Sequence, residues 1–168
     1  MPTFEPITPA NALAYKTVRL WALQDSPRSF GSTYARESQF TDADWIKRAA
    51  NLNTERSVGY LAMEDGNYCG IAGAFLDEQN PLRADLVSMW VAPAARRMGV
   101  GGALVDAIRS WSRLRGAHTL RLMVTSENHS AIKFYEGIGF SMTGHTEPYP
   151  NDPALFEYEM SQQLFGTT

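Results

Sequence analysis

Apolar residues recur along the chain in short runs and alternating patterns that predict β-strands separated by polar turns. Leu120, Leu122 and Val124 repeat with a period of two, as expected for a half-buried strand. Residues 64–67, Glu-Asp-Gly-Asn, are a strong hairpin signal between two apolar runs. The run before Pro93 is rich in large apolar residues, which favours a central strand. The predicted strands cover residues 4–7, 57–63, 68–76, 85–91, 119–125, 140–144 and 155–160, with a loop over 146–153.

Helical periodicity appears between these strands. Residues 103–115 place Leu104, Ile108 and Trp111 on one side and end at Gly116, a typical helix-terminating residue. A second, short helix is predicted over 128–138. Early helices are expected from Thr8-Pro9 to about residue 25, then over 29–37 and from 41 onward. This order predicts an α/β (α+β) fold in which a mixed, mostly antiparallel central sheet is flanked by helices, with residues 1–168 forming a single domain.

Composition and charge narrow the class of protein. The chain has 168 residues, is 44% hydrophobic and 20% charged, and so has enough apolar material for one ordinary core. Its net charge of -3 comes without a basic stripe, so we expect no nucleic-acid partner. No apolar run approaches the ~20 residues of a membrane helix, so no membrane partner is expected. The single cysteine, Cys69, fits a reducing compartment, and we expect a cytoplasmic location.

The segment 85–104 carries the first candidate chemistry. A strand ends at a proline, a loop supplies Arg96, Arg97 and glycines, and a helix begins. Glycines allow close backbone approach, and the free amides of a helix's first turn attract anions, so a pyrophosphate fits here. A dinucleotide fingerprint fails at Leu104 and at Arg121, and the Lys-Ser/Thr of a P-loop is absent. A glycine-rich connection with solvated arginines remains the alternative.

A second segment, residues 128–140, favours the pyrophosphate site over the glycine-rich connection. Ala131, Phe134, Tyr135 and Ile138 share one helix face by their spacing. A tyrosine in an apolar face is usually a plain core residue. Its occurrence about forty residues after an arginine- and glycine-rich loop favours a functional role.

Together the two segments resemble the GNAT family of acetyl-CoA-dependent N-acetyltransferases. Arg96-x-x-Gly99-x-Gly101 matches the family's pyrophosphate loop without a gap, and residues 128–140 match its Asn-x-x-Ala-x-x-Phe-Tyr…Gly-Phe signature. The resemblance implies acetyl-CoA as co-substrate and a small-molecule or peptide amine as acceptor. A second copy of the chain, in a homodimer, is a further candidate partner. No Gly-x-Ser-x-Gly nucleophile elbow is present, so we expect a direct attack of the amine without an acyl-enzyme.

The resemblance assigns roles to individual residues. Tyr135 would lie near the thioester sulfur, where a phenol can stabilise or protonate a departing thiolate. Asn128 would hydrogen-bond the pantetheine arm, with Ser130 beside it in the same site. Arg96 would add charge at the pyrophosphate. Backbone groups would bind the pantetheine from Met89, Trp90 and Val91, and the pyrophosphate from Arg97, Met98, Gly99, Val100, Gly101 and Gly102.

The proton acceptor is less closely defined. Asp85 lies fourteen residues before Gly99, the spacing at which carboxylate-using family members carry their base. A solvated acid beside Arg83 is the alternative interpretation, and Glu64, Glu78 and His145 are possible substitutes. The three histidines show no metal-ligand spacing, so no metal is expected, and Cys69 is expected in the core rather than as a nucleophile.

The acceptor itself is not identified by the sequence. Aromatic residues could wall its pocket and acidic residues could attract a cation; the candidates are Phe30, Tyr34, Trp90 and Tyr149, with Asp25, Glu147 and Asp152. Ordinary helix packing and a solvated loop explain them equally well. A non-catalytic acetyl-CoA-binding module, or an enzyme using another acyl-CoA or a hydroxyl acceptor, also remains possible.

Overall fold

The computed structural model describes residues 1–165 and contains one eight-stranded sheet. Its spatial order is β1-β3-β4-β5-β6-β8-β7, with the short β2 paired to β3. Every pairing is antiparallel except β5 with β6. The strands are β1 Thr3–Pro6, β2 Asn53–Thr54, β3 Ser57–Glu64, β4 Asn67–Leu76, β5 Arg83–Val91, β6 Thr119–Thr125, β7 Ser141–Tyr149 and β8 Asp152–Gln163. The predicted mixed, mostly antiparallel fold is confirmed.

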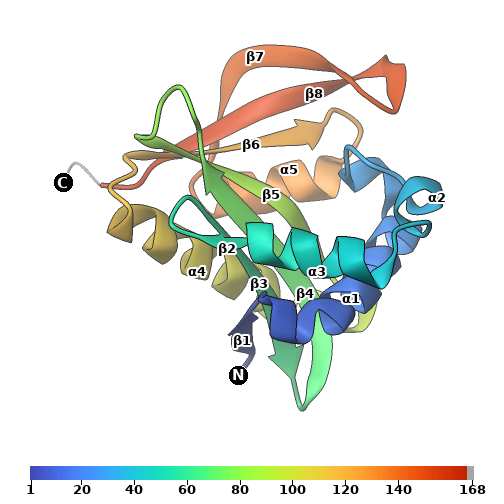
Figure 1. Cartoon of the computed structure of the whole chain (residues 1–168). Helices are drawn as coiled ribbons and strands as arrows, with labels where there is room; N and C mark the ends of the chain where they lie inside the picture. The colour runs from blue at the N-terminus through green and yellow to red at the C-terminus, as the bar shows by residue number, and fades with distance from the viewer. Residues whose placement is uncertain (166–168) are drawn as a thin grey trace.

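Helices cover both faces of this sheet. Figure 1 shows α1 and α3 in front of the sheet and α4 and α5 behind it. The α-helices are α1 Ala12–Asp25, α2 Tyr34–Glu37, α3 Asp42–Asn51, α4 Val100–Leu114 and α5 His129–Gly137. The apolar side predicted for α4 is buried against β3, β4 and β5. None of the helices described within residues 1–165 is long and apolar enough to cross a bilayer.

Two predicted segments differ from the structure. Residues 29–37 are not one helix: Ser29 ends the 3-10 turn η2 Pro27–Ser29, residues 30–33 are not helical, and only the four residues of α2 follow. The loop predicted over 146–153 is instead the end of a long hairpin, in which Glu147 pairs with Glu157 and Tyr149 with Asp152. Pro148 is tolerated because β7 is an edge strand, where a missing N–H breaks no ladder. The longer hairpin extends β8 along the end of β6, where Glu157 pairs with Thr125.

Candidate active site

The parallel strands β5 and β6 separate soon after they meet. Their ladder joins only three residue pairs, from Arg83 with Thr119 to Asp85 with Arg121. Beyond Asp85 the strands diverge (Figure 1). Ser88 has a φ of 57°, and the β4–β5 register shifts at the same place, which indicates a bulge that bends β5. The Arg19 guanidinium donates to the Ser88 hydroxyl at 3.0 Å and so ties this bulge to α1.

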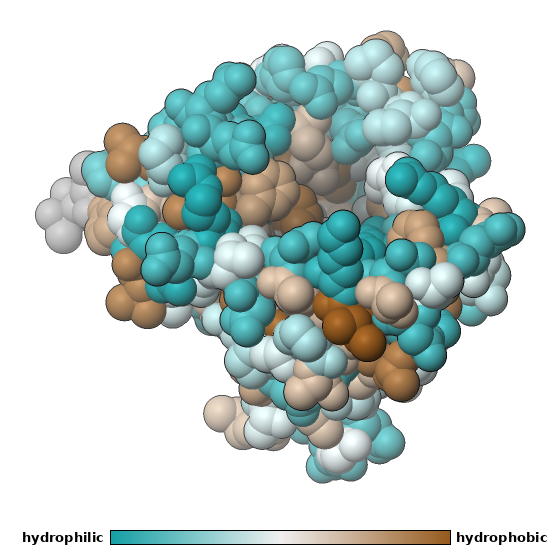
Figure 2. All heavy atoms as spheres, viewed as in Figure 1, coloured by the Kyte–Doolittle hydropathy of each residue, from teal (hydrophilic) through white to brown (hydrophobic). Residues whose placement is uncertain are grey.

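The divergence opens a cleft of about 720 Å³. Residues 86–91 of β5 form one wall and residues 122–125 of β6 the other, with Tyr135 of α5 also lining the space. Figure 2 shows this face of the molecule hollowed between the β7–β8 hairpin and the helices α1 and α3. A smaller adjoining cavity of about 210 Å³ is lined by Arg19, Asp85, Arg121 and Glu157, among others. The site is therefore a long gap in the sheet with a polar side chamber.

One end of the cleft is formed by the loop that leads into α4. Arg97 and Gly99 have positive φ values of 64° and 83°, so the backbone turns sharply before the helix begins. No acceptor within residues 1–165 receives a hydrogen bond from the six consecutive amides of residues 97–102. These amides stand at the positive end of the α4 dipole, a position that attracts anions. The assignment of this loop to a pyrophosphate stays a prediction.

Gly101 explains why that loop needs a small residue. A Cβ atom at Gly101 would lie 3.1 Å from Phe134 Cζ and 3.4 Å from Met89 Cε. At Gly102 a Cβ atom would meet nothing within 4 Å. The first helical turn thus packs tightly against α5 at one glycine and is open at the next.

The two arginines of the loop are exposed but differently held. Arg96 donates from Nε to the Val91 carbonyl at 3.0 Å and forms an ion pair with Asp25. Trp90 Nε1 also donates to Asp25, at 3.0 Å. Burial raises the pKa of Asp25, but hydrogen bonds from Trp90, Ser26 and Arg96 outweigh it and lower the pKa. Asp25 is therefore occupied in holding Arg96 at the cleft.

Helix α5 places three of the predicted residues on the cleft wall: Asn128, Ser130 and Tyr135. Asn128 is the N-cap of α5 and accepts from the Ala131 amide at 3.3 Å. Tyr135 is only 8% exposed and packs edge-on against Phe134 and Phe140. Burial raises the pKa of the Tyr135 phenol above its usual value, so the hydroxyl stays protonated at neutral pH.

The Tyr135 hydroxyl faces the open space. It makes no hydrogen bond within residues 1–165. Among those residues, Trp45 Nε1 is the only fully buried side-chain polar atom without a partner. The unpartnered Tyr135 hydroxyl is therefore accessible, and Tyr135 lines the cleft, where a bound molecule can accept a hydrogen bond from it.

Asp85 is buried at the point where β5 and β6 part. It is 5% exposed, accepts from Arg83 at 3.0 and 3.3 Å, and lies 3.7 Å from Arg121. Burial raises the pKa of Asp85, and the two guanidinium groups offset part of this rise. Asp85 lines the smaller cavity and not the main cleft. Its carboxylate oxygens are thus already engaged by cations.

The other acids and the histidine considered from the sequence lie away from the cleft. Glu64 pairs with the chain's amino terminus, Glu78 lies in the β4–β5 turn, and His145 contacts Glu147 on β7. None of these residues lines either cavity. Within residues 1–165, no group of three or more His, Cys, Asp and Glu side chains is placed to hold a metal ion.

The aromatic wall is brought together in part. Phe30, Trp90 and Tyr149 are buried and line the cleft, whereas Tyr34 is exposed on α2 and does not. The Tyr149 hydroxyl donates to the Phe30 carbonyl at 2.6 Å, which ties the β7–β8 hairpin to the segment after α1. Asp152, at the hairpin turn, does not line either cavity.

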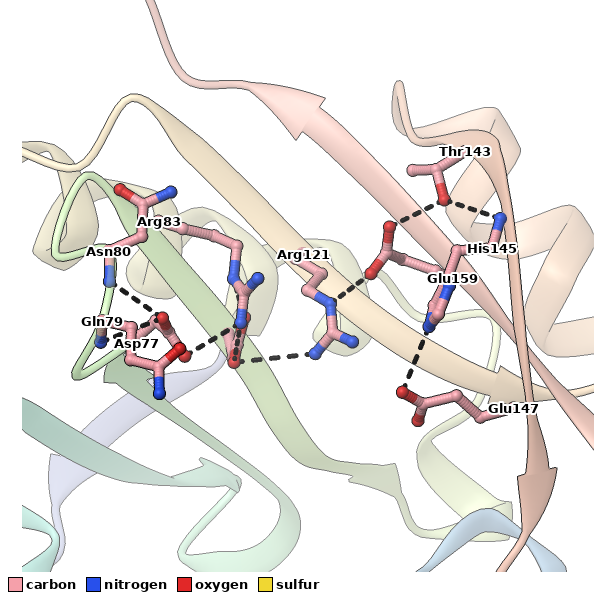
Figure 3. Close-up of polar contacts among 10 residues, drawn as sticks. Asp77, Gln79, Asn80, Arg83, Arg121, Thr143, His145, Glu147 and Glu159 are labelled. Carbon is pink, nitrogen blue, oxygen red and sulfur yellow. Dashed lines mark hydrogen bonds and ion pairs between the residues drawn. The ribbon is translucent and has the colours of Figure 1, made fainter.

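A ladder of charged side chains crosses the sheet beside the site (Figure 3). Arg83 joins Asp77 and Asp85, Arg121 joins Asp85 and Glu159, and Glu159 accepts from Thr143. These contacts connect β5, β6, β8 and β7 on one face. Asp77, Asp85 and Glu159 therefore each have an arginine partner in this ladder.

Two residues of the site were missed from the sequence, Glu157 and Arg19. Glu157 lines both cavities. The signal was available, because Glu157 and Glu159 alternate with Tyr158 and the buried Met160, a pattern that turns both acids to the opposite face. Arg19 carried no such signal, since it lies among apolar helix residues and is buried by its pairing with Glu37.

Comparison with known proteins agrees with this geometry. The family model described as Acetyltransferase (GNAT) family matches residues 17–140. The chain belongs to the GNAT family. Among solved structures, a GNAT acetyltransferase from Streptococcus pneumoniae has the same fold, with a TM-score of 0.76, 17% identity, and 97% and 99% of the two chains covered. A Salmonella typhimurium protein solved with acetyl-CoA gives a TM-score of 0.78 at 16% identity, covering 100% and 96%.

Curated GNAT relatives are similar over part of their length. The [ribosomal protein bS18]-alanine N-acetyltransferase of Escherichia coli (strain K12) is 32% identical over 97 residues, which are 56% of this chain and 62% of that protein. The mycothiol acetyltransferase of Beutenbergia cavernae is 28% identical over 114 residues, 68% of this chain and 38% of that protein. The chain therefore spans less than two thirds of the length of both.

Proposed function

We propose that this GNAT protein transfers the acetyl group of acetyl-CoA to a primary amine of a small molecule or peptide. The observation that carries the proposal is one continuous cleft that joins the start of α4 to Tyr135, whose hydroxyl has no partner within residues 1–165. Four of the six residues with free amides line this cleft: Arg97, Gly99, Gly101 and Gly102, whereas Met98 and Val100 do not. Relatives named as N-acetyltransferases support the reaction class. An acetyl-CoA-bound structure of the same fold supports the co-substrate.

The residues of the cleft fit the parts of acetyl-CoA. The pyrophosphate would accept hydrogen bonds from the amides of residues 97–102, with Arg96 and Arg97 supplying charge. The pantetheine arm would follow the β5 edge at residues 89–91, which has lost β6 as a neighbour. Asn128 and Ser130 would add polar contacts from the N-terminus of α5.

Tyr135 would act on the leaving sulfur. Acetyl-CoA supplies a thioester whose C–S bond breaks as the C–N bond forms, with one proton left on sulfur and one released to solvent. A phenol kept protonated by burial donates a hydrogen bond where negative charge develops, and so stabilises the transition state. The raised pKa favours this hydrogen-bonding role over complete proton transfer.

Proton removal from the amine needs a base, because an alkyl amine is protonated at neutral pH. The assignment of Asp85 stays a prediction. Its two arginine partners weigh against it, because a carboxylate that already accepts from Arg83 has less capacity to accept a proton.

A cytoplasmic location, a homodimer and the single domain over residues 1–168 also stay predictions.

Coenzyme binding tests the proposal directly. Acetyl-CoA should raise the melting temperature of the unmodified protein by mass action, and calorimetry should give a stoichiometric isotherm. Gly101→Glu should abolish both signals, because its side chain would collide with Phe134 and bring negative charge to the anion site. The matched control is Gly137→Glu on α5. A Cβ at Gly137 would meet nothing within 4 Å, and Gly137 does not line the cleft. An unmodified protein that does not respond to millimolar acetyl-CoA would contradict the proposal.

A further inference from the structure

Glu157 of β8 is the single acidic side chain among the residues that line the main cleft. It also lines the smaller cavity, together with Arg19, Asp85 and Arg121. Phe30, Leu86, Val87 and Met123 are likewise shared by the two cavities, so Glu157 lies where they join. Tyr135 lines the same cleft from α5. An acid and a phenol from different elements therefore line the same cleft.

Within residues 1–165, Glu157 is also the acid of this face that no cation or donor engages. Asp85 is held by Arg83, Glu159 by Arg121 and Thr143, and Glu147 by His145. No hydrogen bond or ion pair between described residues involves the Glu157 carboxylate. A partly buried carboxylate without a partner costs free energy, which a bound cation would offset.

The groups that face Glu157 act on its pKa in opposite directions, with a net rise. Burial raises the pKa of Glu157, Glu147 across the β7–β8 ladder raises it further, and Arg121 on β6 offsets part of the rise. Asp85 on β5 and Arg19 on α1 share the smaller cavity. A carboxylate with a raised pKa is a better proton acceptor than an ordinary one.

We propose that Glu157 binds the ammonium group of the acceptor and takes the proton that the nitrogen must lose before it attacks. The proton passes from the nitrogen to a Glu157 oxygen, and the freed lone pair forms the C–N bond as the C–S bond breaks. The acceptor class is then an alkyl amine that is cationic at neutral pH. This inference rests on the proposed acetyl transfer.

Asp85 has a positioning role in this arrangement. It accepts from Arg83 and lies 3.7 Å from Arg121, so it helps to keep Arg121 paired within the ladder rather than with Glu157. Glu159 also pairs with Arg121. The two acids together leave Glu157 free for the acceptor.

The test compares Glu157→Gln with Glu136→Gln, the same change at an exposed acid of α5 that lies outside both cavities and apart from the charged ladder. The acceptor used is the amine with the highest kcat/KM in a panel of polyamines, amino acids, aminoglycosides and peptides. Glu157→Gln should lower kcat/KM at pH 7 by about 10²-fold or more, a typical general-base loss. Glu136→Gln should lower it far less. Asp85→Asn tests the competing assignment in the same assay.

Two further measurements separate proton removal from a structural role. With trifluoroethylamine, which is largely neutral at pH 7, the Glu157→Gln defect should shrink. A neutral amine needs neither ammonium binding nor the loss of a proton before it attacks, and its one remaining proton can pass to the leaving sulfur. Thermal unfolding gives a readout independent of activity. A carboxylate with a raised folded pKa loses its stabilising contribution as pH rises, so Glu157→Gln should melt higher than the unmodified protein at pH 8 and equally at pH 4.

The outcomes distinguish this inference from the proposed function. An unmodified protein that binds acetyl-CoA and turns over an amine, with Glu157→Gln equally active, would overturn the inference alone. A loss confined to Asp85→Asn would also overturn it and restore Asp85 as the base. A protein that binds no acetyl-CoA would overturn the proposed function itself. A Glu157→Gln defect that is equal for cationic and neutral amines would show a structural role and also overturn the inference.

Discussion

Tyr135→Phe tests the leaving-group role with the smallest available change. The substitution keeps the ring and its edge-on contacts with Phe134 and Phe140, and removes only the hydroxyl that reaches the cleft. Because this hydroxyl has no hydrogen-bond partner within residues 1–165, its removal leaves no donor or acceptor unpaired. Folding stability should change by less than about 1 kcal/mol, or roughly 2–4 °C in melting temperature.

The expected kinetic effect follows from the environment of the hydroxyl. A hydrogen bond to a charged group contributes about 1.5–3 kcal/mol, and Tyr135 would make it only as charge develops on the sulfur. This corresponds to a fall of about 10- to 150-fold in kcat. Affinity for acetyl-CoA should stay nearly constant, because the ground-state thioester sulfur is a weak acceptor.

Steady-state kinetics with saturating acetyl-CoA would measure kcat, and calorimetry would measure coenzyme affinity separately. Tyr15→Phe is the matched control, since Tyr15 is also buried but does not line the cleft. An unchanged kcat in Tyr135→Phe, with coenzyme affinity intact, would refute the reasoning and make Tyr135 a core residue. A large loss of stability would also contradict it, because it would reveal a partner for the hydroxyl.

Two other predictions concern stability. Gly102→Ala should stabilise the protein by about 0.5–1 kcal/mol, or roughly 1–4 °C in a thermal melt, because alanine favours the helix and its Cβ would meet nothing within 4 Å. An equal gain for Gly101→Ala would contradict the tight packing of Gly101 against Phe134. Burial raises the pKa of Glu37, but hydrogen bonds and charge from Arg19 and Arg48 outweigh it and lower the pKa to about 2. Glu37 therefore stabilises the fold above its ordinary pKa of 4.5 and loses this contribution as pH falls through about 2. In urea unfolding, the free energy of unfolding of Glu37→Gln should be lower than that of the unmodified protein by about 3–5 kcal/mol at pH 7, and this difference should shrink toward pH 2. Equal stability at pH 7 would refute the buried pairing of Glu37 with the two arginines.

Local patterns were enough to predict most elements and to select the two segments proposed to bind acetyl-CoA. The proposed role of residues 96–102 depends on consecutive backbone amides and glycines, and that of the α5 face on residues one turn apart, so short stretches of sequence are enough to predict both. The end of the β7–β8 hairpin was missed because Pro148 and Pro153 suggest a loop. Whether a proline breaks a strand depends on which neighbour that strand has, and only the sheet order supplies this.

The sequence by itself therefore determined the family, the glycine-rich turn that leads into α4 and the placement of Tyr135 on a packed helix face. Tertiary structure decided where the cleft opens, because β5 and β6 part beyond Asp85, where β5 has a bulge at Ser88. Arg19, which binds the Ser88 hydroxyl, is 69 residues from Ser88 along the chain. It also decided which acids are free. Asp85 is paired by Arg83 and Arg121 while Glu157 is not, and this depends on four strands meeting in one sheet. Charge pairing across strands has no signature in local sequence, because each partner is selected by spatial distance.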